Sequence, residues 1–112
     1  MRGIIIMENA SILERTKKLL EEAPFAGESL DTKVLQLLCS EYLRHLGQYR
    51  RVDLLMQQKY GMTFDEFVSQ KVVREKKYSW DVESDAMEWE TAISGIKTME
   101  RKIKELRKEG CV

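Results

Sequence analysis

The chain has 112 residues, enough for one domain with a modest hydrophobic core. Its 19 basic and 19 acidic residues give a formal net charge of zero, so no overall field attracts it to nucleic acid or to an anionic membrane. One proline and six glycines are too few for the many turns of a β-sandwich or barrel. We therefore expect a single all-α domain over residues 1–112.

The N-terminal ten residues contain the apolar run Gly3–Met7. This run is too short for the core of a signal peptide or for a membrane span. Three interpretations of residues 1–10 stay open: a disordered leader, a short strand, or residues upstream of a true start at Met7.

A first helix is expected to open at Ser11, because Ser11 and Glu14 have the spacing of a capping box. Apolar residues then recur on one helical face. They are Ile12, Leu13, Leu19, Leu20 and Ala23. Pro24 cannot continue a helix, so residues 25–28 are interpreted as a connector.

A second, long helix is predicted to begin after Ser29, a good N-terminal cap, and to end at Gly61. Helical spacing of apolar residues is sustained without proline up to Tyr60, and an unbroken helix would be about 45 Å long. Gly47 lies inside it and costs about 1 kcal/mol relative to alanine. It either weakens the helix there or lets a neighbouring backbone approach closely.

A third, short helix is expected after Thr63, which forms a second capping box with Glu66. The residues expected to face the core are Phe64, Phe67 and Val68. Residues 60–67 are thus predicted to form a packed corner. The following segment, Lys71–Lys77, has four basic residues and two valines and is interpreted as a connector with a basic rim.

The C-terminal helix carries the strongest pattern, and it is expected to run from Val82, or from a cap at Ser84, to about Glu109. Apolar residues alternate three and four positions apart between strongly charged flanks, which is the seam of a coiled-coil-like helix. Gly95 would let two helices approach closely at this seam. The predicted interface residues are Trp89, Ala92, Ile96, Met99, Ile103 and Leu106.

The expected fold is therefore a helical bundle with two long helices and two shorter ones. The chain is short for covering long helices on all sides, so association is expected. Trp80 and Trp89 are large anchors of the kind that dominate binding interfaces. Core packing is the competing interpretation for Trp89, because a seam residue can serve the core of the chain, an interface, or both.

Acidic residues cluster around the start of the C-terminal helix, at Asp81, Glu83, Asp85, Glu88 and Glu90. Such a cluster can bind magnesium for nucleotide chemistry. However, di-metal helical bundles place carboxylates one turn apart and repeat the pair on a second helix, which this chain does not do. The favoured interpretation is that the acids complement the positive end of the helix, and no metal or other cofactor is expected.

The one histidine and the two cysteines of the chain are further side chains that could carry chemistry. His45 has Glu41 one turn earlier, but no serine, cysteine or second histidine is placed to complete a site, so a partly buried helix residue is expected. Cys39 lies in an apolar helical run and Cys111 is next to last, so the two are no disulfide framework. Cys39 is interpreted as a structural thiol in a reducing, cytoplasmic setting.

Two groups of basic residues could line a phosphate-binding face. The first is Arg44, Arg50, Arg51 and Lys59, and the second is Lys71, Arg74, Lys76 and Lys77. Each group has acidic neighbours within a turn or two. Ordinary solvated surface is therefore favoured, with a charged partner protein next and nucleic acid third.

Three stretches of the second half of the chain carry a resemblance. They are Lys59–Phe67 (KYGMTFDEF), Tyr78–Asp85 (YSWDVESD) and Glu88–Glu90 (EWE). Together they resemble small, uncharacterised prokaryotic helical proteins of toxin-antitoxin-like two-gene modules. The resemblance implies an antitoxin or accessory role and carries over no catalytic residue. The zero net charge and the lack of a DNA-reading motif depart from many antitoxins.

The sequence thus predicts a cytoplasmic, non-enzymatic helical interaction module that pairs with a second copy, a small partner protein, or both. The first alternative is a small metal-dependent nucleotide-processing enzyme that uses the acidic cluster. The second is a nucleic-acid-binding module that uses Lys71–Lys77. No membrane association is expected.

Overall fold

The computed structural model describes residues 12–23 and 29–110, which form five helices and, within those two ranges, no strand. The helices are α1 (Glu14–Glu22), α2 (Leu30–Tyr60), α3 (Phe64–Ser69), α4 (Val72–Glu75) and α5 (Trp80–Lys108). The predicted all-α class is confirmed. The expectations that fall outside the described ranges concern residues 1–10, Ser11, Pro24, residues 25–28 and Cys111.

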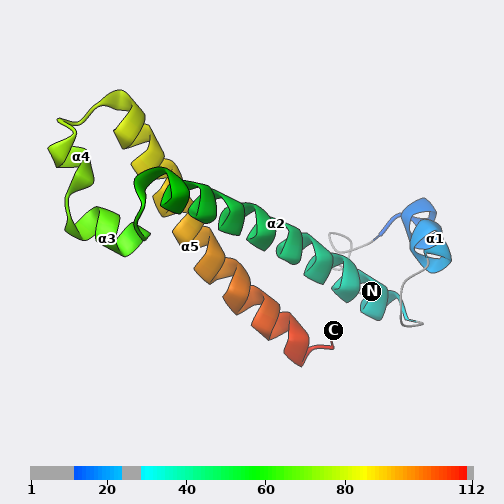
Figure 1. Ribbon diagram of the computed structural model, residues 1–112. Helices are drawn as coiled ribbons and strands as arrows, with labels where there is room; N and C mark the ends of the chain where they lie inside the picture. The colour runs from blue at the N-terminus through cyan, green and yellow to red at the C-terminus, as the bar shows by residue number, and fades with distance from the viewer. Residues whose placement is uncertain (1–11, 24–28, 111–112) are drawn as a thin grey trace, which may run out of the picture.

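The two long helices, α2 and α5, pack side by side and run in opposite directions (Figure 1). The short helices α3 and α4 lie at one end of this hairpin, and α1 lies at the other end of α2. The molecule measures 62 × 30 × 24 Å and has a radius of gyration of 20.5 Å. A compact chain of this length would have a radius of gyration of about 13 Å. The domain is therefore an elongated hairpin with small helices at its ends.

The first helix, α1, begins at Glu14 and not directly after Ser11. The residue before its first turn is Leu13, whose side chain cannot accept a hydrogen bond, and the predicted capping residue Ser11 lies outside the described residues. A buried lysine of α2, Lys33, donates a 2.6 Å hydrogen bond from Nζ to the carbonyl oxygen of Glu21. This bond satisfies one of the carbonyls left open at the C-terminal end of α1 and ties α1 to α2.

The long helix α2 has the boundaries that its capping residues predict. Ser29 Oγ accepts a 3.0 Å hydrogen bond from the N–H of Thr32. At the other end, Gly61 takes the left-handed conformation (φ +68°) and donates its N–H to the carbonyl of Gln57 at 2.7 Å. The helix continues through Gly47, where an added Cβ would meet no described atom within 4 Å. The alternative that a neighbouring backbone approaches Gly47 is therefore wrong.

The capping box of α3 is confirmed in both directions. Thr63 donates its N–H to Glu66 Oε1 at 2.9 Å, and Glu66 donates its N–H to Thr63 Oγ1 at 3.2 Å. Phe67 is 2% exposed, as a core residue should be, but Val68 is 56% exposed. The prediction for Val68 is wrong because this short helix buries only the side that carries Phe64 and Phe67.

The segment Lys71–Lys77 is more ordered than the predicted connector, because it contains the single helical turn α4. This turn buries Val72 against the core. Left-handed residues flank it, with φ values of +53° at Lys71, +57° at Lys77 and +55° at Tyr78. The turn is thus placed by burial of one valine between two sharp reversals of the backbone.

The last helix, α5, starts earlier than predicted. It begins at Trp80, so both expected starts, Val82 and Ser84, already lie inside the helix. Its first turn carries acidic side chains, which favourably complement the positive end of the helix as expected. Its end at Lys108, with Glu109 as the C-terminal cap, agrees with the prediction.

The main cluster of the hydrophobic core lies where α3 and α4 join the long helices. Its buried members are Met56, Phe67, Val72 and Trp89. The ring centroid of Trp89 lies 5.0 Å from that of Phe67 and 5.9 Å from that of Tyr60. Its indole N–H donates a 2.9 Å hydrogen bond to Asp53 Oδ1, so the buried polar atom is satisfied. The packed corner predicted for residues 60–67 is confirmed.

Candidate protein interaction surfaces

The predicted seam of α5 is placed in the contact between α5 and α2 of the same chain. Trp89, Ala92 and Ile103 are buried. The other three predicted interface residues, Ile96, Met99 and Leu106, are partly buried. Much of this seam therefore serves the hairpin of a single chain, and most of it is not open to a partner.

Gly95 is the close-approach point that the sequence suggested. An added Cβ at Gly95 would lie 2.5 Å from Cδ2 and from Cε2 of Tyr49. That distance is far below van der Waals contact, so only glycine lets the tyrosine ring of α2 lie this close to the backbone of α5.

Exposed leucines line the outer surfaces of α2. Leu43 and Leu54 are eleven residues apart, which is close to three helical turns, so they share one side of the helix. This side borders a groove of about 320 Å³ between the two long helices. We call it the flank groove, and it is lined by Leu43, Leu46, Arg50, Glu100, Ile103 and Arg107. Arg50 Nη2 and Glu100 Oε2 bridge it at 2.9 Å.

A second concave surface lies at the corner, beside the core. It is a hollow of about 410 Å³ that we call the corner hollow. Its apolar walls are Phe64, Phe67 and Val68 from α3, Val72 and Val73 from α4, and Ala86 from α5. Three elements that are separate in sequence therefore meet around it. The helical pattern did not reveal this hollow, although the exposed Val68 and the two adjacent valines were the available signals.

The rim of the corner hollow is polar and mostly cationic. Lys71 and Arg74 stand on the α4 side, Glu90 stands on α5, and the exposed Tyr78 closes the rim. Within residues 12–23 and 29–110, no ion pair engages Lys71 or Arg74. The hollow thus combines an apolar floor with two cations that face solvent.

Large apolar side chains extend the surface beyond this hollow. Trp80 is 78% exposed and Met87 is 69% exposed. They are seven residues apart on α5 and so share one side of the helix, and Met87 is three residues before Glu90 on the rim. The predicted anchor Trp80 is therefore available to a partner, whereas Trp89 belongs to the core.

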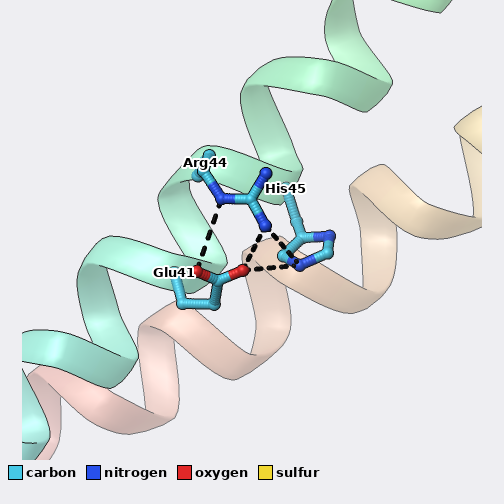
Figure 2. A network of polar contacts seen from close by, with 3 residues as sticks. All are labelled: Glu41, Arg44 and His45. Carbon is cyan, nitrogen blue, oxygen red and sulfur yellow. Dashed lines mark hydrogen bonds and ion pairs between the residues drawn. The ribbon is translucent and has the colours of Figure 1, made fainter.

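His45 belongs to a polar network with Glu41 and Arg44 on α2 (Figure 2). Glu41 accepts hydrogen bonds from Arg44, and His45 Nε2 lies 3.0 Å from Glu41 Oε1. The hydrogen bond from Arg44 holds the pKa of Glu41 below its ordinary value. All three residues come from neighbouring turns of one helix, and Glu41 and Arg44 are exposed, which is typical of a solvated ion pair. His45 is partly buried, as expected from the sequence.

The acidic cluster of α5 is partly used for structure. Asp85 Oδ2 accepts hydrogen bonds from Lys59 Nζ at 2.5 Å and from Tyr60 Oη at 2.6 Å, which joins α5 to the end of α2. The bond from Lys59, and then that from Tyr60, lowers the pKa of Asp85. Burial and the bond to Asp85 raise the pKa of Tyr60 to about 12. Among the described residues, no group of three or more His, Cys, Asp or Glu could hold a metal ion.

The two basic groups differ in how far they are neutralised. Three members of the first group are paired: Arg44 with Glu41, Arg50 with Glu100 and Lys59 with Asp85. The second group, on and around α4, is exposed. Of the two groups, the second therefore leaves more of its positive charge open to a partner, and it lies beside the corner hollow.

Cys39 corrects one expectation from the sequence. It is buried on α2 and is disulfide-bonded, so the interpretation as a structural thiol is wrong.

Across the parts of the chain that the structure describes, no helix is both long and apolar enough to cross a membrane.

Comparisons with known protein families, with curated proteins and with solved structures find no match to this chain. The resemblance to proteins of two-gene modules therefore stays a prediction from three short stretches of sequence.

Proposed function

We propose that this chain is a non-enzymatic protein–protein interaction module that works as a homo-oligomer. In the simplest form, two copies pack their α2–α5 hairpins together along the flank groove. The observation that carries this proposal is the row of exposed leucines on α2 beside that groove, on a helix whose other side already packs against α5.

The shape of the molecule supports self-association. A hairpin of two helices covers each long helix on one side only, whereas a bundle of four helices covers both. The chain is elongated, and its main cluster of buried side chains lies at one end. Fully burying a leucine contributes about 1.5 to 3 kcal/mol, so the half-exposed leucines of α2 offer a favourable free energy of association.

The charge balance supports the same proposal. The formal net charge of zero means that two copies do not repel each other as wholes. The flank groove itself carries both signs, since Arg50, Glu100 and Arg107 line it, so a second copy can place complementary charges across it.

Light scattering during size exclusion at micromolar concentration tests the proposal. We expect the mass of a dimer or a higher oligomer of the 13.2 kDa chain. A single species with the mass of one chain, unchanged on raising the concentration, would contradict it.

The resemblance suggests a more specific form, in which the chain is the antitoxin or accessory member of a two-gene pair. The test is to express the product of the adjacent gene alone and together with this chain. Growth arrest by the neighbour that this chain relieves would support that form, and growth unaffected by either would contradict it. A cytoplasmic location stays a prediction, and with Cys39 disulfide-bonded the cysteines do not support it.

A further inference from the structure

We propose that the corner hollow is a docking site for an acidic peptide segment of a partner protein. One large apolar side chain of the segment fills the hollow, and carboxylates beside that anchor pair with Lys71 and Arg74. This site is separate from the flank groove and does not depend on self-association.

The dimensions and walls of the hollow fit an apolar anchor. Its volume of about 410 Å³ falls within the range of about 300 to 1,000 Å³ typical of ligand pockets. The walls are phenylalanine and valine side chains, with the small Ala86 at the α5 side. Val68, on the α3 wall, is more than half exposed, so an anchor would remove apolar surface from water.

The charges around the hollow favour carboxylates. The net charge of the chain is zero, but the segment Lys71–Lys77 is basic. It contains one acid, Glu75, and four basic residues, which are Lys71, Arg74, Lys76 and Lys77. In the described ranges none of the four is ion-paired. Glu90 faces them from α5 and would repel a carboxylate, so the acids of the segment are directed to the α4 side.

The surface beyond the hollow favours a peptide over a small molecule. Trp80 and Met87 leave most of their area exposed on the adjoining part of α5, where a ligand that only fills the hollow would not cover them. Tryptophan is enriched in binding hot spots, and methionine adapts to varied apolar partners. A segment of several residues can fill the hollow and continue over both side chains.

The backbone of the rim is also unusual. Lys71 and Tyr78 line the hollow, and both have positive φ values that residues other than glycine rarely adopt. Strained backbone of this kind is concentrated at binding sites, where it fixes the direction of side chains. Here it fixes both ends of α4, which carries Arg74.

The experiment is a display selection of random 15-residue peptides on the full chain, followed by fluorescence anisotropy with synthetic copies of the enriched peptides. We expect the enriched peptides to share one large apolar residue flanked by Asp or Glu. Reversing the two rim charges together (Lys71→Glu with Arg74→Glu) should weaken binding by about tenfold or more. Arg51→Glu reverses a single charge at an exposed basic position of α2 outside the hollow; it is the control and should leave binding unchanged.

The variants are checked by circular dichroism and light scattering, which report folding and association independently of peptide binding. Enriched peptides without carboxylates, or binding that the rim reversal leaves unchanged, would overturn the proposal. So would a selection that yields no binders, or one in which only decanoate, used as a small amphiphilic probe, binds at the hollow. Peptide binding by a monomeric chain would support this site while contradicting self-association.

Discussion

Gly95 of α5 packs directly against the ring of Tyr49 on α2. In Gly95→Ala the new Cβ would lie 2.5 Å from two ring carbons, so the ring or the helix must move. We expect the free energy of unfolding to fall by about 1 to 3 kcal/mol, the usual cost of overpacking. Urea denaturation followed by circular dichroism measures it.

Gly47→Ala is the matched control, because its Cβ would point into open space on the same hairpin. Alanine favours helix over glycine, so this variant should be more stable by about 0.5 to 1 kcal/mol. Replacing Tyr49 with alanine should reduce the cost of Gly95→Ala. A Gly95→Ala protein stabilised as much as Gly47→Ala would show that the two helices do not meet closely there.

Tyr60 gives the fold a sensitivity to alkaline pH. Burial, followed by the hydrogen bond to Asp85, raises its pKa from the ordinary value of 10.0 to about 12. A raised pKa means that the neutral phenol stabilises the folded state, fully below pH 10, and that this stability is lost as the pH rises toward 12. We expect the free energy of unfolding, measured by urea titration at successive pH values, to decline across this window.

Tyr60→Phe removes the ionisable group and keeps the ring that packs on Trp89. Its stability should be lower at neutral pH, because Asp85 loses a hydrogen bond, but should decline less between pH 10 and 12. Parallel pH profiles for the two proteins would mean that another group causes the alkaline loss.

The sequence predicts which single residues are buried better than it predicts their hydrogen-bond partners. Burial of Trp89 follows from the apolar seam, because periodicity reports which face of a helix is apolar. Its partner Asp53 could not be found this way, since it lies 36 residues earlier and no local pattern marks it. Lys33 was missed for the same reason, because its acceptor is a backbone carbonyl of another helix.

At the scale of elements, α3 is held by its phenylalanine face. Phe67 is almost fully buried against Trp89 and Tyr60, so Phe67→Ala should lower the free energy of unfolding by about 3 to 5 kcal/mol. Val68→Ala, the next residue on the same helix but exposed, is the control and should cost much less. Equal effects from the two variants would place α3 differently against the core.

The boundaries of the helices were predictable where side-chain capping determines them. Ser29, Thr63 and Gly61 marked their ends correctly, because each satisfies backbone groups through chemistry visible in the sequence. The turn α4 and the early start of α5 were missed. Their positions depend on burial of Val72 and on left-handed backbone, and neither has a capping signature.

At the scale of the molecule, the sequence indicated two long helices but not which surfaces they would bury. An apolar stripe does not specify which surface packs against it, so the seam of α5 was equally compatible with an interface and with the core. The corner hollow was not foreseen because its walls come from three elements that meet only in the folded chain. The flank groove likewise exists only once α2 lies against α5.

Substitution of exposed leucines of α2 tests the proposed homo-oligomer directly. Leu43→Asp with Leu54→Asp places two charges beside the flank groove without touching the core, so it should convert the oligomer to a monomer. The matched control is Leu37→Asp with Leu55→Asp. These residues are eighteen apart, share a different side of the same helix and are similarly exposed, at 42% and 52% against 43% and 55%.

Both double variants carry the same loss of helix propensity, so circular dichroism should show similar helix content in the two. Light scattering then separates them: the flank variant should have the mass of one chain, while the control keeps the mass of the wild type. If only the control dissociates, the interface lies on the side of α2 that carries Leu37 and Leu55. If both double variants keep the mass of the wild type, the interface lies away from α2. In either case the flank groove would be free in the assembly, and the packing of hairpins proposed above would be wrong.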